Sequence, residues 1–210
     1  MRGISINRVI RILLLFIFVA NVGEALFVPV FAIFVTNIVS GATFSTIGLA
    51  VAFSAIAKSI CQVPLARYLD KKYGEHDDFW AMIAGSLLAT LASFSLLIIS
   101  LPWHLYLVNV VVGVSSAALM AAYYSVFAHH ADKGSEGLEW SLFSVVGLTV
   151  STALGAAIGG YVADFFGIRI LIVAVGMMNV VATALLLFLY PFLLVRTKPI
   201  LEEQNSVFIE

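Results

Sequence analysis

Two charged side chains interrupt the long apolar runs of this sequence. Glu24 lies inside the first run, and Lys58 lies inside the second. A charged side chain at the centre of a bilayer costs about 2.5–3.5 kcal/mol or more, so it usually faces a cavity or an oppositely charged partner. A carboxylate in such a place can exchange a proton, hold a cation or anchor the amine of a substrate. We therefore expect Glu24 and Lys58 to take part in transport and proton coupling.

A purely structural ion pair is the alternative for the same two residues, with Lys58 as a fixed counter-ion of Glu24. At a rise of about 1.5 Å per residue the two differ in depth by about 8 Å, which two long side chains could span. If they pair, a proton that arrives at Glu24 would release Lys58, and such a release is a local two-state switch.

Three further polar residues follow these charges at helical spacing. Asn21 precedes Glu24 by three residues and so shares its helix face. Ser54 and Gln62 lie four residues before and after Lys58, which makes one polar stripe. We expect all three to line a substrate cavity.

A later apolar run, 104–128, carries Asn109, Ser116 and Tyr123 near one helix face. These side chains could supply hydrogen bonds and an aromatic surface to a cavity wall. Contacts between helices are the alternative, because small and hydroxyl residues also serve helix packing in membranes.

The elements that must position these residues are membrane-spanning helices. Of 210 residues, 62% are apolar and 11% are charged, whereas a soluble domain has about 45–50% and about 25%. This composition excludes a soluble or disordered protein, and the net charge of −1 offers no basic field to a nucleic acid. A bilayer-crossing helix needs about 20 mostly apolar residues. Six runs are that long: 9–35, 44–65, 79–100, 104–128, 140–163 and 168–194.

The six runs predict an all-α membrane protein with one transmembrane domain over residues 1–195. They do not alternate as the strands of a membrane barrel would. Of the 11 Lys and Arg residues, one is Lys58 inside the membrane, Arg169 lies on one side, and the remaining nine lie on the other. Because positive charge marks the cytoplasmic side, we expect both termini, and a short tail at 196–210, to be cytoplasmic.

The fifth run and the connection after the second carry motifs that resemble the major facilitator superfamily. The fifth has Gly147, Gly155, Gly159 and Gly160, then Gly167-Ile-Arg169. The connection has Asp70-Lys71, as in the loop that follows the second helix in this family. The resemblance covers about residues 9–194. It implies that the glycines serve close helix approach or bending, and that Asp70 is a gate residue facing a helix N-terminus of the other half.

The same resemblance implies a fold and an assembly. Family members normally have twelve helices in two halves, and this chain resembles one half, with helices one to three and four to six as an inverted 3+3 repeat. It also implies that the helices of Glu24 and Lys58 are antiparallel neighbours. A parallel homodimer, related by a two-fold axis along the membrane normal, would rebuild the twelve-helix arrangement.

We therefore predict a secondary transporter of a small solute in the cell membrane, surrounded by membrane lipid, with proton-coupled export favoured. No ATP-binding loop, His-Glu-x-x-His motif or complete serine-protease motif is present, so we expect no enzyme activity, cofactor or metal site. A transporter made with a different six-helix chain, and a scaffold subunit that does not transport, remain alternatives. The sequence does not identify the solute.

Overall fold

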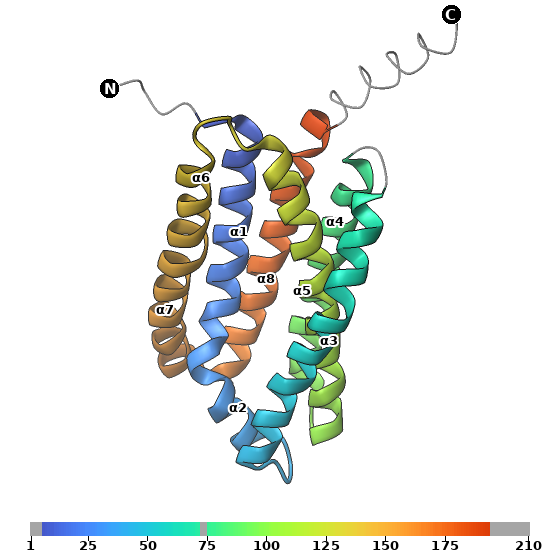
Figure 1. Ribbon diagram of the computed structural model, residues 1–210. Helices are drawn as coiled ribbons and strands as arrows, with labels where there is room; N and C mark the ends of the chain where they lie inside the picture. Colours follow the sequence, from blue (N-terminus) through green and yellow to red (C-terminus); the bar gives the residue numbers. More distant parts are fainter. Residues whose placement is uncertain (1–5, 72–74, 194–210) are drawn as a thin grey trace, which may run out of the picture.

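The computed structural model of the protein describes residues 6–71 and 75–193. Within these residues every regular element is a helix, and the long helices stand side by side in one bundle (Figure 1). The predicted tail at 196–210 lies outside the described residues. We call the end of the bundle where α1 begins the N-terminal end.

Six helices of the described chain are long and apolar enough to cross a membrane. Three are continuous or nearly so: α3 (Phe44–Asp70), α5 (Pro102–His130) and α8 (Ile168–Leu187). The other three change helix type along their length. They are α1–η1–α2 (Arg8–Phe27, Val28–Val30, Phe31–Ile38), α4–η2 (His76–Ser95, Leu96–Ile98) and α6–η3–α7 (Glu136–Leu142, Phe143–Val150, Ser151–Phe166).

Local chemistry explains two of the changes of direction. Pro29 opens the 3-10 turn η1, because proline has no N–H and its ring disfavours a continuing α-helix. Gly167 joins α7 to α8 with φ of +83°, a conformation that glycine adopts without steric cost. The segment η3 is a π-helix.

The helices pack in an open chain of neighbours. α1 packs against α7 and α8, α8 against α4, α4 against α5, and α5 against α3. α3 meets the first span mainly through α2, at the end opposite the N-terminal end, and α1 does not pack along it. The two spans predicted to be neighbours therefore join at one end and separate toward the other.

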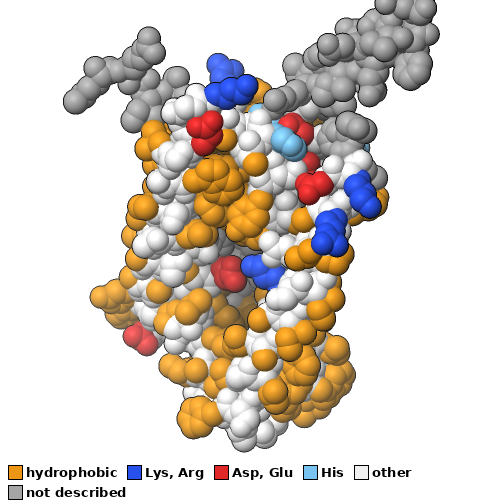
Figure 2. Space-filling model, in the orientation of Figure 1, with side chains coloured by type: hydrophobic (Ala, Val, Ile, Leu, Met, Phe, Trp, Pro, Cys, Tyr) orange, Lys and Arg blue, Asp and Glu red, His pale blue; other side chains and the backbone are white. Residues whose placement is uncertain are grey.

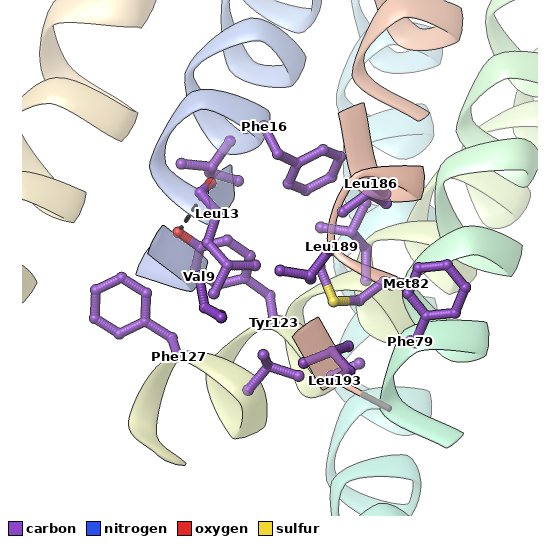
Figure 3. Packing of buried hydrophobic residues seen from close by; sticks show 14 of the residues in the cluster. Val9, Leu13, Phe16, Phe79, Met82, Tyr123, Phe127, Leu186, Leu189 and Leu193 are labelled. Atoms are coloured by element: carbon purple, nitrogen blue, oxygen red, sulfur yellow. Dashed lines mark hydrogen bonds between the residues drawn. The ribbon is translucent and has the colours of Figure 1, made fainter. Parts of the chain in front are cut away.

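The largest apolar core lies in the N-terminal half of the bundle (Figure 3). Leu13 and Phe16 of α1 meet Met82 of α4, Tyr123 of α5 and Leu189 there, and all five side chains are fully buried. This core closes the bundle between α1, α4, α5 and the end of the last span. It fixes the helices that carry the candidate site.

Candidate functional site

Glu24 and Lys58 lie on the two helices that separate. Glu24 is surrounded by many protein atoms, and yet its side chain is accessible to solvent. This combination is characteristic of a residue on a concave surface. Lys58 is half-buried on α3. Among the described residues no ion pair within 4.0 Å joins the two. Figure 2 shows a hollow at mid-height with an acidic and a basic side chain beside each other at its edge.

The direction of Glu24 follows from the contacts of its neighbours on α1. Val22 and Ala25 face α7, where a side-chain carbon at Gly155 would lie 2.5 Å from the carbonyl oxygen of Val22. Gly23 faces α8, because a carbon added there would lie 2.7 Å from Cβ of Met178. With about 3.6 residues per turn, Glu24 lies on the remaining face, away from both helices.

Lys58 is held in place by the contact between α3 and α5. A side-chain carbon at Gly113 of α5 would meet the carbonyl of Ser54 and lie 2.9 Å from Cβ of Ala57. Only glycine lets the two backbones come so close. Ser54, Lys58 and Gln62 are all half-buried, so the predicted stripe lies along the edge of this contact.

Asn21 ties α1 to the fifth span. Its side-chain amide donates to Oγ of Ser151 (2.7 Å), to Oγ1 of Thr152 (2.8 Å) and to the carbonyl of Leu148 (3.1 Å). These acceptors lie where η3 passes into α7. Asn21 thus anchors the wall that carries Glu24, one turn before it.

The predicted residues of α5 do not form one surface. The amide of Asn109 donates to the carbonyl of Leu105 in its own helix (2.9 Å), and Ser116 is half-buried. Tyr123 has 0% exposure and lies in the apolar core, where its hydroxyl is 3.4 Å from the carbonyl of Leu13 (Figure 3). Its predicted place on a cavity wall is wrong for this structure, because the helices have converged at that depth.

The glycines of the fifth span differ in their surroundings. Additional side-chain carbons would meet Ile17 at Gly147 (2.8 Å), Ala25 at Gly155 (2.6 Å) and the carbonyl of Leu26 at Gly159. No atom lies within 4 Å of the same point at Gly160. Three of the four glycines therefore serve close approach to α1, and Gly160 does not. Asp70 ends α3 and is exposed.

Comparison with known proteins decides the family. The sequence model of the Major Facilitator Superfamily matches residues 13–208. The chain belongs to this superfamily. It is a multi-pass membrane protein of a transporter family, and its six candidate spans fit one half of a family member.

A curated member of the superfamily also aligns with the chain. The proton-coupled antiporter flippase LtaA of Staphylococcus saprophyticus subsp. saprophyticus is 26% identical over 139 residues. The alignment covers 66% of this chain and 34% of that protein. The chain thus spans about a third of the length of this superfamily relative.

Sequence reasoning missed a group of buried polar side chains at the N-terminal end. Oε1 of Glu75 lies 3.4 Å from Nδ1 of His130, Asp78 accepts from Ser125 (3.2 Å), and Glu139 accepts from the backbone of Asp132 (3.1 Å). Acidic residues at the starts of α4 and α6 are the available signal, because helix N-termini favour them. Their burial depends on how α4, α5 and α6 meet.

Proposed function

We propose that this chain is one half of a proton-coupled secondary transporter, which exports a small solute from the cell by alternating access. The observation that carries the proposal is that Glu24 on α1 and Lys58 on α3 lie on two membrane-spanning helices that do not pack along each other. A member of a transporter family has little reason to keep two membrane-embedded charges apart unless they serve the transport path. The aligned relative, a proton-coupled antiporter flippase, supports proton coupling and antiport.

The coupling step uses the attraction between the two charges. When Glu24 is ionised, it attracts Lys58 and favours a narrow hollow. A proton on the Glu24 carboxylate removes that attraction and frees Lys58. A solute with a cationic or amphiphilic group competes with the proton for Glu24, so that proton and solute move in opposite directions.

The other candidate residues act around this pair. In the proposal Asn21, Ser54, Gln62, Asn109 and Ser116 border the path in one or more of its states. Gly147, Gly155 and Gly159 let α7 slide or bend against α1. Asp70 holds the closed state by facing a helix N-terminus of the second half, where the helix dipole stabilises a carboxylate by about 0.3–1 kcal/mol.

A second copy of the chain supplies the missing half in this proposal. Two copies with both termini in the cytoplasm, each an inverted 3+3 repeat, form a parallel dimer around a central path. α3 supports this arrangement, because most of its residues are exposed although it lies inside the membrane.

Proton movement in liposomes tests the transport proposal. The full chain is reconstituted with a trapped pH dye, a panel of amphiphilic amines is added outside, and the dye response is recorded for the unchanged chain and for Glu24→Gln. We expect the amine-driven proton signal to fall at least tenfold in Glu24→Gln, whereas Asp164→Asn, an exposed acid at the end of α7, keeps it. An equal signal from Glu24→Gln would contradict the proposal.

Native mass spectrometry of the chain in lipid nanodiscs tests the assembly. A particle with two copies is the expected result. A particle with a single copy would contradict the homodimer and leave a transporter made with another six-helix chain, or a subunit that does not transport.

A further inference from the structure

The separation of Glu24 and Lys58 carries information about the solute itself. Most charged side chains inside a membrane protein pair directly with an opposite charge. Here Glu24 and Lys58 form no ion pair within 4.0 Å among the described residues, and the helices that carry them do not pack along each other. Figure 2 shows a hollow at mid-height with an acidic and a basic side chain at its edge.

The helix packing fixes the backbones that carry the two charges. α1 is held to α7 and α8 by close contacts at Gly155, Gly159 and Gly23, so it cannot rotate as a whole helix toward α3 without breaking them. α3 is held to α5 in the same way at Gly113. Because these contacts involve backbone and Cβ atoms rather than flexible side-chain ends, the two walls move only as whole helices.

A ligand with one charge leaves such a site unbalanced. A cation would pair with Glu24 and leave Lys58 without a partner in the membrane, and an anion would do the reverse. An ion that stays unpaired in a low-dielectric environment is strongly unfavourable. A ligand with a cationic and an anionic group satisfies both walls at once and adds no net charge.

We infer that the hollow binds a zwitterion, with its cationic group at Glu24 and its anionic group at Lys58. The inference rests on the proposed transport function and specifies the substrate class for that site. Gln62 lies one turn from Lys58 on the same stripe and is half-buried, which places a second N–H donor beside the anionic group. Lys58 is then a specificity residue and not only the counter-ion of Glu24.

Binding of a matched series of probes tests this assignment. The probes are the ω-amino acids from glycine to 8-aminooctanoate, with the alkylamine and the alkanoate of the same length as partners. Binding to the full chain in nanodiscs is measured by calorimetry and by ligand-induced thermal stabilisation. We expect one length of zwitterion to bind at least tenfold more tightly than both of its singly charged partners.

Variants at Glu24 and Lys58 should test the cationic and the anionic group of the ligand one at a time. Lys58→Gln should reduce zwitterion binding at least tenfold to the level of the matched amine, and Glu24→Gln should reduce it to the level of the matched acid. Lys133→Gln, a change of an exposed lysine between α5 and α6, is the control and should leave binding unchanged. The double swap Glu24→Lys with Lys58→Glu should restore part of the binding, because it keeps both charges and exchanges their places. A cooperative thermal unfolding transition of each single variant without ligand shows that it is folded.

Three outcomes would overturn the assignment. They are equal binding of zwitterion and amine, no tighter binding by any zwitterion in the series, and unchanged zwitterion binding in Lys58→Gln. Proton movement is read separately in the liposome assay. If Glu24→Gln abolishes that signal while amine and zwitterion bind equally, the transport proposal stands and the zwitterion inference fails. Tight zwitterion binding without any proton signal would support the zwitterion inference and contradict proton coupling.

Discussion

The N-terminal end of the bundle and the mid-height hollow treat charged groups in opposite ways. At the N-terminal end Glu75, Asp78 and Glu139 each have a partner on a neighbouring residue or helix. At the hollow Glu24 and Lys58 lie on helices that do not pack along each other. Charges of the first kind join helices together, whereas charges of the second kind remain available to a solute or a proton. Under the proposed function, this difference separates charges that hold the fold together from charges that serve transport.

The largest expected effect tests whether the N-terminal end is the stable part. Tyr123→Ala removes a fully buried ring that packs against Phe127 and Phe143. We expect the free energy of unfolding to fall by about 3–5 kcal/mol, as for other large-to-small changes in cores. Unfolding by SDS titration in bicelles measures it. Tyr124→Ala, next along the chain and 39% exposed, is the matched control, and an equal loss there would contradict the distinction.

The second-largest expected effect concerns the contact between α7 and α1, the helix that carries Glu24. Gly159→Ala places a methyl group against the carbonyl of Leu26, whereas the same methyl at Gly160 meets nothing within 4 Å. We expect Gly159→Ala to lower the free energy of unfolding by about 2 kcal/mol, because overpacking against backbone is costly. Gly160→Ala should have no effect or raise stability by up to about 1 kcal/mol, since alanine favours helix. The prediction fails if the two variants melt alike.

Removal of both charges from the hollow should raise the free energy of unfolding, whereas the two changes above lower it. A charged side chain held inside a membrane protein without a direct partner is unfavourable, so its replacement by a neutral residue favours the folded state. We expect Glu24→Gln with Lys58→Gln to raise the free energy of unfolding by about 1 kcal/mol and to abolish the proton signal in liposomes. A gain in stability together with a loss of activity would assign the two charges to function. A clear loss of stability would show instead that they hold the fold together.

The smallest effect sharpens the comparison at the N-terminal end. Ser125→Ala removes the hydroxyl that donates to Asp78 and leaves that buried carboxylate with one partner fewer. We expect a loss of roughly 1 kcal/mol in the free energy of unfolding, with transport unchanged. Ser141→Ala, which changes a hydroxyl bonded only within its own helix turn, serves as the control. Reduced transport without reduced stability would instead assign Asp78 to the charges that serve transport.

The spans were predictable from sequence because each depends on local composition. Six apolar runs correspond to six helices, and Pro29 marks a break in the first. Several helix ends were harder to place, since α3 continues to Asp70 and α6 begins at Glu136, both beyond the apolar runs. Polar residues near a membrane surface can continue a helix, and composition alone does not show where they stop.

The candidate site was predictable only in part. Glu24 and Lys58 stand out by type, but the gap between them depends on which helices pack together. Tyr123 follows Asn109 and Ser116 at a spacing of seven residues, and such a line drifts by about 20° per seven residues on a straight helix. It therefore passes from a half-buried position into the core as the helices converge. The buried acids of the N-terminal end were missed because burial of an acid at a helix start requires knowledge of its neighbours.

The 3-10 turn Val28–Val30 has a mechanical consequence. α2 packs on α3, whereas α1 packs on α7 and α8. The first membrane crossing thus changes its main helix neighbours at this turn, where Pro29 interrupts the regular helix. We therefore expect a change in the width of the hollow to involve a change of angle at these three residues. The turn begins four residues after Glu24. The expected hinge and the charge therefore lie about one helix turn apart.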